Sequence, residues 1–162
     1  MKTIITDIKD FNISVAGDHK VIKPDREIKP CIGCFGCWVK TPGTCVILDG
    51  YENLGHIFSE SDEVIIVSRC CFGSVSPFVK TVQDRALSYL SAHFTYRKGE
   101  MHHKRRYNNK LILSAWFYGN DLTEMEKETA KSLIFDNADN YDASVGEVQF
   151  FSDIMEMEGR EL

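Results

Sequence analysis

The chain has 162 residues, 43% of them hydrophobic and 27% charged, which is typical of one soluble globular domain spanning residues 1–162. No stretch approaches the ~20 consecutive apolar residues of a membrane span, and the first residues lack the apolar core of a signal peptide, so we expect a cytoplasmic protein without a membrane segment. The net charge of −5 and the shortness of the single basic stretch argue against nucleic-acid binding.

The first predicted elements are short strands. Residues 3–8 form a β-branched run, and residues 20–23 are a second brief strand. The first cysteine follows too soon to leave room for a full helix as well as a second strand.

The segment that follows contains the most chemically informative residues. The first three of its four cysteines are spaced at i, i+3 and i+6, and the glycines between them allow a tight turn that brings their sulfurs together. Pro42-Gly43 then reverses the chain and returns the fourth cysteine toward them. A cluster of thiolates on a short loop suits an iron–sulfur centre, a zinc ion or a redox switch. The four candidate metal ligands are Cys31, Cys34, Cys37 and Cys45.

The spacing of these cysteines favours a four-iron cluster over zinc. Structural zinc sites usually present two separate Cys-x-x-Cys pairs, whereas here three thiols lie within seven residues. Free cysteines are also often buried without any ligand, so unliganded or redox-active thiols are a further alternative. Nothing indicates export from a reducing compartment, which disfavours a structural disulfide.

Strands and helices then alternate. A helix over 51–59 precedes a nearly continuous apolar run over 63–68, as expected of a strand buried on both faces. Ser76-Pro77 marks a helix start, and its apolar face is expected to extend through Val79, Val82, Ala86 and Leu90.

The last third of the chain continues the alternation. A second buried strand over 111–117 ends at Tyr118-Gly119-Asn120, and Thr123 with Glu126 forms a capping box at the next helix. A final strand covers 145–151, and the acidic tail 152–162 is expected to form a short helix. The apolar face of the capped helix is expected at Leu122, Met125, Thr129, Ala130, Leu133 and Ile134. This alternation predicts an α/β sandwich with a parallel sheet.

A basic stretch lies between the two buried strands. Residues 97–110 hold six Lys or Arg against one acid, with His102-His103 beside them in a predicted exposed loop. Such a loop can grip a nucleotide phosphate. An ordinary solvated loop and a subunit contact are the alternatives.

Two motifs resemble the flavodoxin-like NADPH-dependent FMN reductase and iron–sulfur flavoprotein family. The first is Lys29–Trp38 with Gly43–Ile47, and the second is Phe72–Lys80, ending in Asp84-Arg85. Tyr118-Gly119 and residues 126–138 resemble the end of that family's pattern. The resemblance implies a flavodoxin-like three-layer sandwich with a parallel sheet of order 2-1-3-4-5, and FMN beyond the carboxyl ends of the strands.

The resemblance also implies a flavin site. Residues that would border the ring are Arg69, Cys70, Cys71, Phe72, Gly73 and Ser74, and those at the end of the next strand are Trp116, Tyr118 and Gly119. Trp116 and Tyr118 are candidate ring-stacking aromatics, with core packing as the alternative. The chain departs from the family at Arg69-Cys70-Cys71, where relatives commonly carry a proline and a tyrosine.

A second departure concerns the FMN phosphate. The family holds it on a Ser-, Arg-, Asn- and Thr-rich loop after the first strand, but here that strand is followed by Asp7 and Asp10, and the first βα unit is shortened. Carboxylates at this position would repel a phosphate. The phosphate would then be held by the basic 97–106 loop or by a partner subunit, or FMN would not bind.

The resemblance implies an NAD(P)H-dependent FMN reductase or an oxidoreductase of the iron–sulfur flavoprotein type, with a possible [4Fe-4S] cluster. NAD(P)H or a reduced carrier would supply electrons to FMN, and a small acceptor such as a quinone, nitro compound or free flavin would receive them. The alternatives are a non-catalytic partner subunit of a flavoprotein and a thiol or metal redox protein without flavin. The family also implies a homo-oligomer or pairing with another flavodoxin-like subunit. The sequence identifies no catalytic residue and contains no hydrolase motif.

Overall fold

The fold is built on a five-stranded sheet. A computed structural model describes all 162 residues and places the strands in the order β2-β1-β3-β6-β7, each parallel to its neighbours. Counted within this sheet alone, the order is 2-1-3-4-5, so the predicted α/β flavodoxin-like topology is confirmed. The five strands are β1 (Lys2–Thr6), β2 (His19–Ile22), β3 (Glu63–Arg69), β6 (Ile112–Tyr118) and β7 (Ser144–Phe151).

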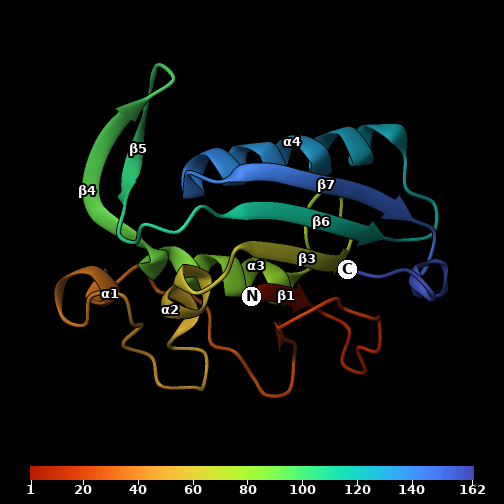
Figure 1. Cartoon of the computed structure of the whole chain (residues 1–162), viewed down its shortest axis with the longest axis horizontal. Helices are drawn as coiled ribbons and strands as arrows, with labels where there is room; N and C mark the ends of the chain where they lie inside the picture. The colour runs from red at the N-terminus through yellow and green to blue at the C-terminus, as the bar shows by residue number, and fades with distance from the viewer.

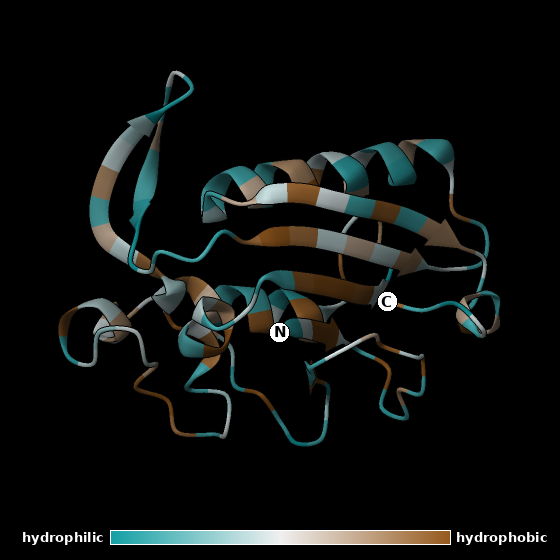
Figure 2. Cartoon of the chain, in the orientation of Figure 1, coloured by the Kyte–Doolittle hydropathy of each residue, from teal (hydrophilic) through white to brown (hydrophobic).

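Helices cover one face of this sheet (Figure 1). The larger core cluster lies between them and the sheet, and the apolar runs of β3 and β6 supply its centre, visible as brown segments in Figure 2. The helices are α2 (Leu54–Ser59), α3 (Pro77–Arg85) and α4 (Glu124–Tyr141), while a single turn, α1 (Gly36–Val39), lies within the cysteine segment. None of the helices is both long and apolar enough to cross a membrane.

The opposite face of the sheet is covered by irregular chain. The connection from β1 to β2 contains no helix, which agrees with the predicted shortening of the first βα unit. It packs Ile13 on this face beside Met157 and Leu162 of the C-terminal tail. The two segments also pair through Ala16 N–H to Leu162 O (2.9 Å) and Leu162 N–H to Ser14 O (3.0 Å). The tail forms only a short 3₁₀ helix, Ile154–Met157.

The basic stretch is not a loop. It belongs to an antiparallel hairpin, β4 (Leu90–Arg97) and β5 (Glu100–Arg105), that projects from one end of the sheet (Figure 1). The prediction that His102-His103 lies in an exposed loop is therefore wrong, because both residues are in β5 and half-buried. The predicted helical face through Leu90 is also wrong there, because α3 ends at Arg85 and Leu90 begins β4.

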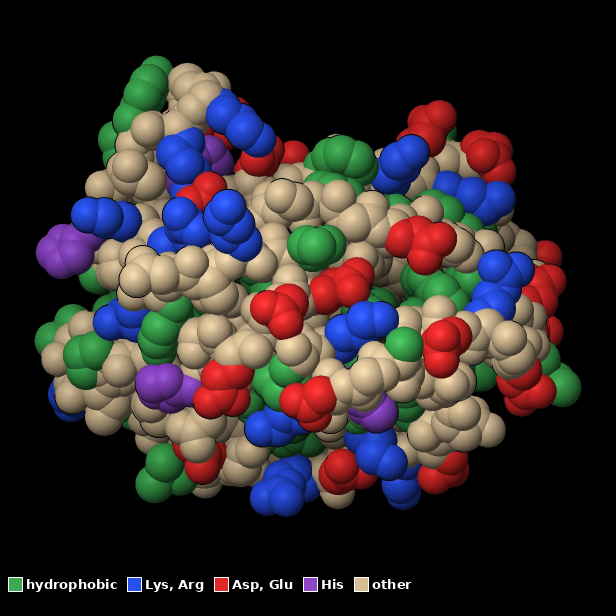
Figure 3. Space-filling view, viewed as in Figure 1, with side chains coloured by type: hydrophobic (Ala, Val, Ile, Leu, Met, Phe, Trp, Pro, Cys, Tyr) green, Lys and Arg blue, Asp and Glu red, His purple; other side chains and the backbone are tan.

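The hairpin is tied to the C-terminal end of α4. The Asp142 carboxylate pairs with Arg97 at 3.1 Å and with Arg105 at 2.9 Å, and Lys98 pairs with Asp139 at 2.6 Å. Lys and Arg side chains gather over this end of the molecule (Figure 3). Much of the basic charge of the hairpin is thus already balanced within the chain.

Candidate functional site

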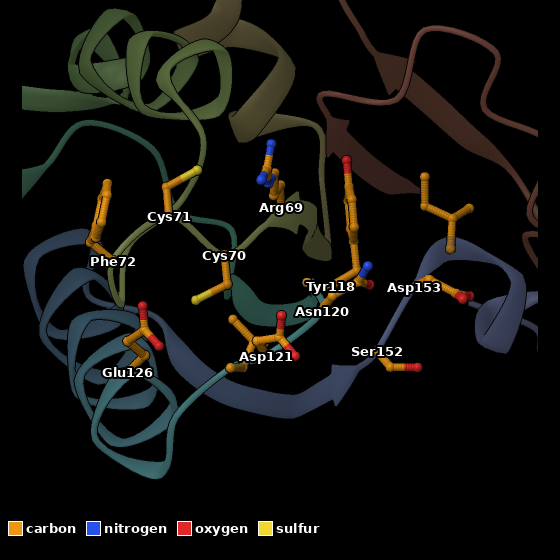
Figure 4. Close-up of a pocket in the computed structure, with 13 residues that line it drawn as sticks. Arg69, Cys70, Cys71, Phe72, Tyr118, Asn120, Asp121, Glu126, Ser152 and Asp153 are labelled. Atoms are coloured by element: carbon orange, nitrogen blue, oxygen red, sulfur yellow. The ribbon is translucent and has the colours of Figure 1, made fainter.

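The main candidate site is a cavity of about 770 Å³ at the carboxyl ends of β3 and β6. In open parallel sheets, ligands bind beyond this edge, where loops from neighbouring strands meet. The volume lies within the range of small-molecule and cofactor sites. Figure 4 shows the lining side chains, which are Arg69, Cys70, Cys71, Phe72, Tyr118, Gly119, Asn120, Asp121, Leu122, Glu126, Ser152, Asp153 and Ile154.

A tight turn after β3 forms one wall of the cavity. Cys71 and Ser74 exchange two backbone hydrogen bonds, at 2.7 and 2.9 Å, and the two residues between them have positive φ, 52° at Phe72 and 76° at Gly73. The geometry leaves the Phe72 ring 95% exposed at the cavity rim. A Cβ on Gly73 would stand 2.8 Å from Cβ of Thr129, so only glycine lets this turn rest against α4.

The floor of the cavity joins β3 and β6 to the segment after β1. Asp7 accepts hydrogen bonds from the Tyr118 hydroxyl at 3.1 Å and from the Arg69 backbone N–H at 3.2 Å. Figure 4 shows the Arg69 and Tyr118 side chains pointing toward that segment. Burial, followed by the Asp7 carboxylate, raises the pKa of Tyr118, so its phenol stays protonated and donates to Asp7.

The two cysteines of the cavity differ in environment. Cys70 is buried and Cys71 is half-buried, and their sulfurs point in different directions (Figure 4). Burial is the main cause that raises the pKa of the Cys70 thiol, with the charge of Glu126 adding to it. Cys70 is therefore a protonated, weakly nucleophilic thiol at neutral pH.

Trp116 does not line the cavity. It lies two residues before the end of β6, so its ring is buried below the edge and packs on Phe151 with ring centroids 5.1 Å apart. The indole N–H donates to Glu147 at 3.2 Å. Among the residues expected at the site, Gly73 and Ser74 belong to the turn, and Tyr118 and Gly119 lie at the cavity itself.

Residues from the loops after β6 and β7 were not foreseen. They supply the acids Asp121 and Asp153, and the first turn of α4 adds Glu126. A signal was present, because Tyr118-Gly119-Asn120 and Ser152 each follow a predicted strand. The carboxyl ends of parallel strands share one edge, so residues just beyond them converge.

The four cysteines of the loop lie at the other end of the sheet from the cavity, beside the hairpin (Figure 1). Cys31 and Cys34 are exposed, Cys37 is half-buried and Cys45 is buried. Burial, then the charges of the other three thiols, raises the pKa of Cys37. Their side chains are not arranged as a metal-binding group. A [4Fe-4S] cluster takes four cysteine thiolates, but the positions of these four sulfurs do not form a coordination sphere.

A row of rings connects this cysteine loop to the hairpin. Ring centroids are 5.4 Å apart for Phe35 and Trp38, 4.6 Å for Trp38 and His103, and 4.7 Å for His103 and Phe94. Phe35 and Phe94 are 60% and 62% exposed. The loop and hairpin thus form one surface with exposed aromatic side chains.

The cavity suits the ring system of FMN but not its phosphate group. An exposed aromatic ring, a Tyr and a glycine turn suit a flat ring system. The phosphate lacks a binding loop, because no helix follows β1 and the Asp7 carboxylate lies at this edge of the sheet. The hairpin, which was one predicted holder of the phosphate, projects from the other end of the sheet (Figure 1).

Comparison with known proteins gives relatives over part of the chain. An iron-sulfur flavoprotein of Methanocaldococcus jannaschii is 39% identical over 62 residues, which are 38% of this chain and 31% of that protein. An iron-sulfur flavoprotein of Archaeoglobus fulgidus is 34% identical over 82 residues, 51% of this chain and 36% of that protein. The matched region thus spans about a third of the length of these curated relatives. No family model matches the chain.

Two solved structures share the fold over nearly the whole chain. The azoreductase AzrA aligns with a TM-score of 0.55 at 11% identity and covers 92% of this chain and 86% of its own. An azoreductase from Bacillus anthracis aligns with a TM-score of 0.58 at 12% identity, covering 93% and 86%. The chain therefore has a flavodoxin-like fold, and its resemblance in sequence to the iron–sulfur flavoproteins is confirmed.

Proposed function

We propose that this protein is a flavin-dependent oxidoreductase whose flavin ring lies in the cavity at the carboxyl edge of the sheet. When bound there, a flavin would supply two-electron redox chemistry between a donor such as NAD(P)H and a small acceptor, for example a quinone or nitro compound. The main support is the cavity itself, which lies where this fold binds ligands and is walled by a glycine turn.

The chain's own residues have separable roles in this proposal. The Cys71–Ser74 turn forms one wall, and the exposed Phe72 at the rim would border a bound ring. Tyr118 and Arg69 form the floor, where the phenol is held by Asp7. No side chain here is assigned to proton transfer.

Flavin binding can be tested on the purified protein together with one variant. Purification without oxygen, followed by an absorption spectrum, should show flavin bands near ~450 nm, or the colourless protein should bind added flavin. Gly73→Ala pushes a Cβ against Thr129 and should weaken flavin binding at least about tenfold, because the wall shifts. Gly99→Ala is the matched control, since Gly99 also has positive φ (89°) but has open space around it in the hairpin turn.

The possible outcomes separate the candidate functions. Flavin binding that is weakened by Gly73→Ala but not by Gly99→Ala supports the oxidoreductase. A protein that binds no flavin in any form rejects it. In that case, co-purification with a flavodoxin-like protein points to a partner subunit, and bound zinc points to a metal protein without flavin.

We further propose that Cys31, Cys34, Cys37 and Cys45 hold a [4Fe-4S] cluster. The number and softness of the donors support this assignment, and closing the loop on the metal would bring the exposed thiols to the buried one. Iron analysis should find about four irons per chain, and serine at any of the four positions should remove them. Cys70→Ser and Cys71→Ser are the controls and should keep the iron. Stoichiometric zinc, or no metal after anaerobic reconstitution, rejects the assignment.

The distance between the cysteine loop and the cavity favours an oligomer. Within one copy the two lie at opposite ends of the sheet (Figure 1), so a cluster held by the cysteine loop would lie near a flavin site only if that site belonged to a second copy. Phe94, Tyr96 and Met101 are 62%, 75% and 70% exposed on the hairpin and offer apolar surface for such a contact. Light scattering coupled to size-exclusion chromatography should show a multiple of 18.5 kDa, and a monomer rejects this arrangement.

A further inference from the structure

The backbone donors at the floor of the cavity are already occupied by the chain itself. Asp7, the residue after β1, accepts from the Arg69 N–H and from the Tyr118 hydroxyl. The Cys70 N–H donates to the Tyr118 carbonyl at 2.8 Å, and the Gly119 N–H donates to the Phe151 carbonyl at 3.1 Å. The Asp7 carboxylate thus occupies two of these donors and backbone carbonyls occupy the other two, so none of the four is free to bind an anion.

The helix starts at the cavity rim are also capped by the chain's own acids. At α4, the Glu126 carboxylate accepts from the Thr123 N–H at 2.9 Å, and the Thr123 hydroxyl accepts from the Glu126 N–H at 3.2 Å. Asp153 accepts from the N–H groups of Met155 and Glu156, at 2.7 and 3.2 Å. Helix N-termini bind phosphate through free N–H groups. Here the Glu126 N–H already donates to the Thr123 hydroxyl, and the Met155 and Glu156 N–H groups donate to the Asp153 carboxylate.

The charge of the cavity lining also disfavours the binding of a phosphate. Its lining contains three acids, Asp121, Glu126 and Asp153, and one base, Arg69. Asp7 adds a fourth carboxylate directly behind the lining. A phosphate monoester carries about two negative charges at neutral pH and is repelled by such a set, which ordinary salt only partly screens. Uncharged hydroxyl groups, in contrast, can donate hydrogen bonds to these carboxylates.

We propose that the cavity binds flavin in its dephosphorylated form, riboflavin, in preference to FMN. The proposal rests on the flavin-binding function proposed above and narrows its ligand. The ring would pack against the wall formed by the Cys71–Ser74 turn. The hydroxyls of the ribityl chain would donate hydrogen bonds to the carboxylates that line the cavity. The carboxylates that cap the local N–H groups then act as selectivity elements against a phosphate.

Parallel titrations of the flavin-free protein with riboflavin and with FMN test this preference. Quenching of flavin fluorescence gives Kd for each at the same pH and ionic strength. Riboflavin should bind at least about tenfold more tightly at low salt, and the ratio should shrink as salt screens the carboxylates. The result that overturns the proposal is an FMN affinity equal to or higher than that of riboflavin, which would leave the flavin function standing. Binding of neither ligand rejects the flavin function itself.

One carboxylate can be neutralised without changing its shape. Asp7→Asn keeps an oxygen that accepts from Tyr118 and Arg69 but removes the charge, so it should raise the ratio of FMN affinity to riboflavin affinity several-fold. Asp136→Asn, at an exposed position in the second half of α4, removes the same charge far from the cavity and is the control. Equal effects of the two variants on the ratio of affinities would count against Asp7 as a selectivity element.

Discussion

Arg85 and Asp49 form a buried ion pair at the base of the cysteine segment. The guanidinium donates to the two carboxylate oxygens at 2.8 and 3.0 Å, and the side chains are 0% and 6% exposed. Arg85 also donates to the carbonyls of Lys29, before the first cysteine, and Ile47, after the last. One side chain of α3 thus holds both ends of the cysteine segment.

Breaking this pair should strongly destabilise the fold. Asp49→Asn leaves the Arg85 charge buried without a counter-charge, a change that typically costs about 3–5 kcal/mol. Urea denaturation should show this loss as a lower midpoint. Asp84→Asn is the matched control, because Asp84 is the neighbour of Arg85 in the chain but pairs with Lys80 at the surface; it should cost less than about 1 kcal/mol. A loss below 1 kcal/mol for Asp49→Asn would show that the pair contributes little.

The same pair should make stability fall in acid. Burial alone would raise the pKa of Asp49, but hydrogen bonds from Arg85 and from the N–H groups of Lys29 and Tyr51 outweigh it and lower the pKa to about 2. Because this is below the unfolded value of about 3.9, the unfolded state binds the proton more readily, and stability is lost as pH falls from about 4 to about 2. Denaturation midpoints measured over this range should drop less in Asp49→Asn than in the parent protein. Parallel curves would contradict the linkage.

The sheet could be predicted from sequence because its strands are buried on both faces. The runs at 63–68 and 111–117 are nearly continuous in apolar residues, and both are strands in the structure. The capping box at Thr123 and Glu126 is also confirmed. The hairpin was not predicted because its many charged residues leave only a weak alternation of apolar and polar side chains. Its turn did leave a signal, since Lys98-Gly99, both at positive φ, is a two-residue hairpin turn.

The buried face of α4 was predicted only in part. Met125 and Leu133 were expected inside, but they are 77% and 38% exposed. Ala130 and Ile134 are buried as predicted, and the buried stripe continues through Ala138 and Tyr141, which the prediction did not include. More than one face of this helix carries apolar residues, and only tertiary packing decides which face is buried.

The candidate site was also predicted only in part. The turn over 71–74 and Tyr118 were expected from the family resemblance, and both border the cavity. The acids Asp121, Glu126 and Asp153 were not foreseen, because they converge only through the topology of the sheet. The four cysteines were recognised as a group, but the sequence could not show that they lie at the opposite end from the cavity.

The thiols of the metal-free cysteine loop should differ in reactivity. Burial and the neighbouring thiols raise the pKa of Cys37, so less of it is thiolate at neutral pH, whereas Cys31 and Cys34 are exposed. Iodoacetamide should label Cys37 more slowly than Cys31 and Cys34 at pH 7, as followed by peptide mass spectrometry. The gap should narrow as pH rises and Cys37 ionises. Labelling of Cys37 first would contradict the order.

Asp142 should contribute most to holding the hairpin in place, because it pairs with both strands, whereas Asp139 pairs only with Lys98 in the turn. Asp142 ends α4 in the left-handed conformation (φ 56°), and its carboxylate is shared by Arg97 and Arg105 from the two strands. Asp142→Asn tolerates that backbone but removes both ion pairs, so amide hydrogen exchange over 90–105 should accelerate several-fold while the strands of the main sheet stay protected. Asp136→Asn, which removes an acid from the exposed side of the same helix, should leave the hairpin unchanged. Equal exchange in both variants would mean that strand pairing and the contacts of His103 with Trp38 and Phe94 are enough to hold the hairpin.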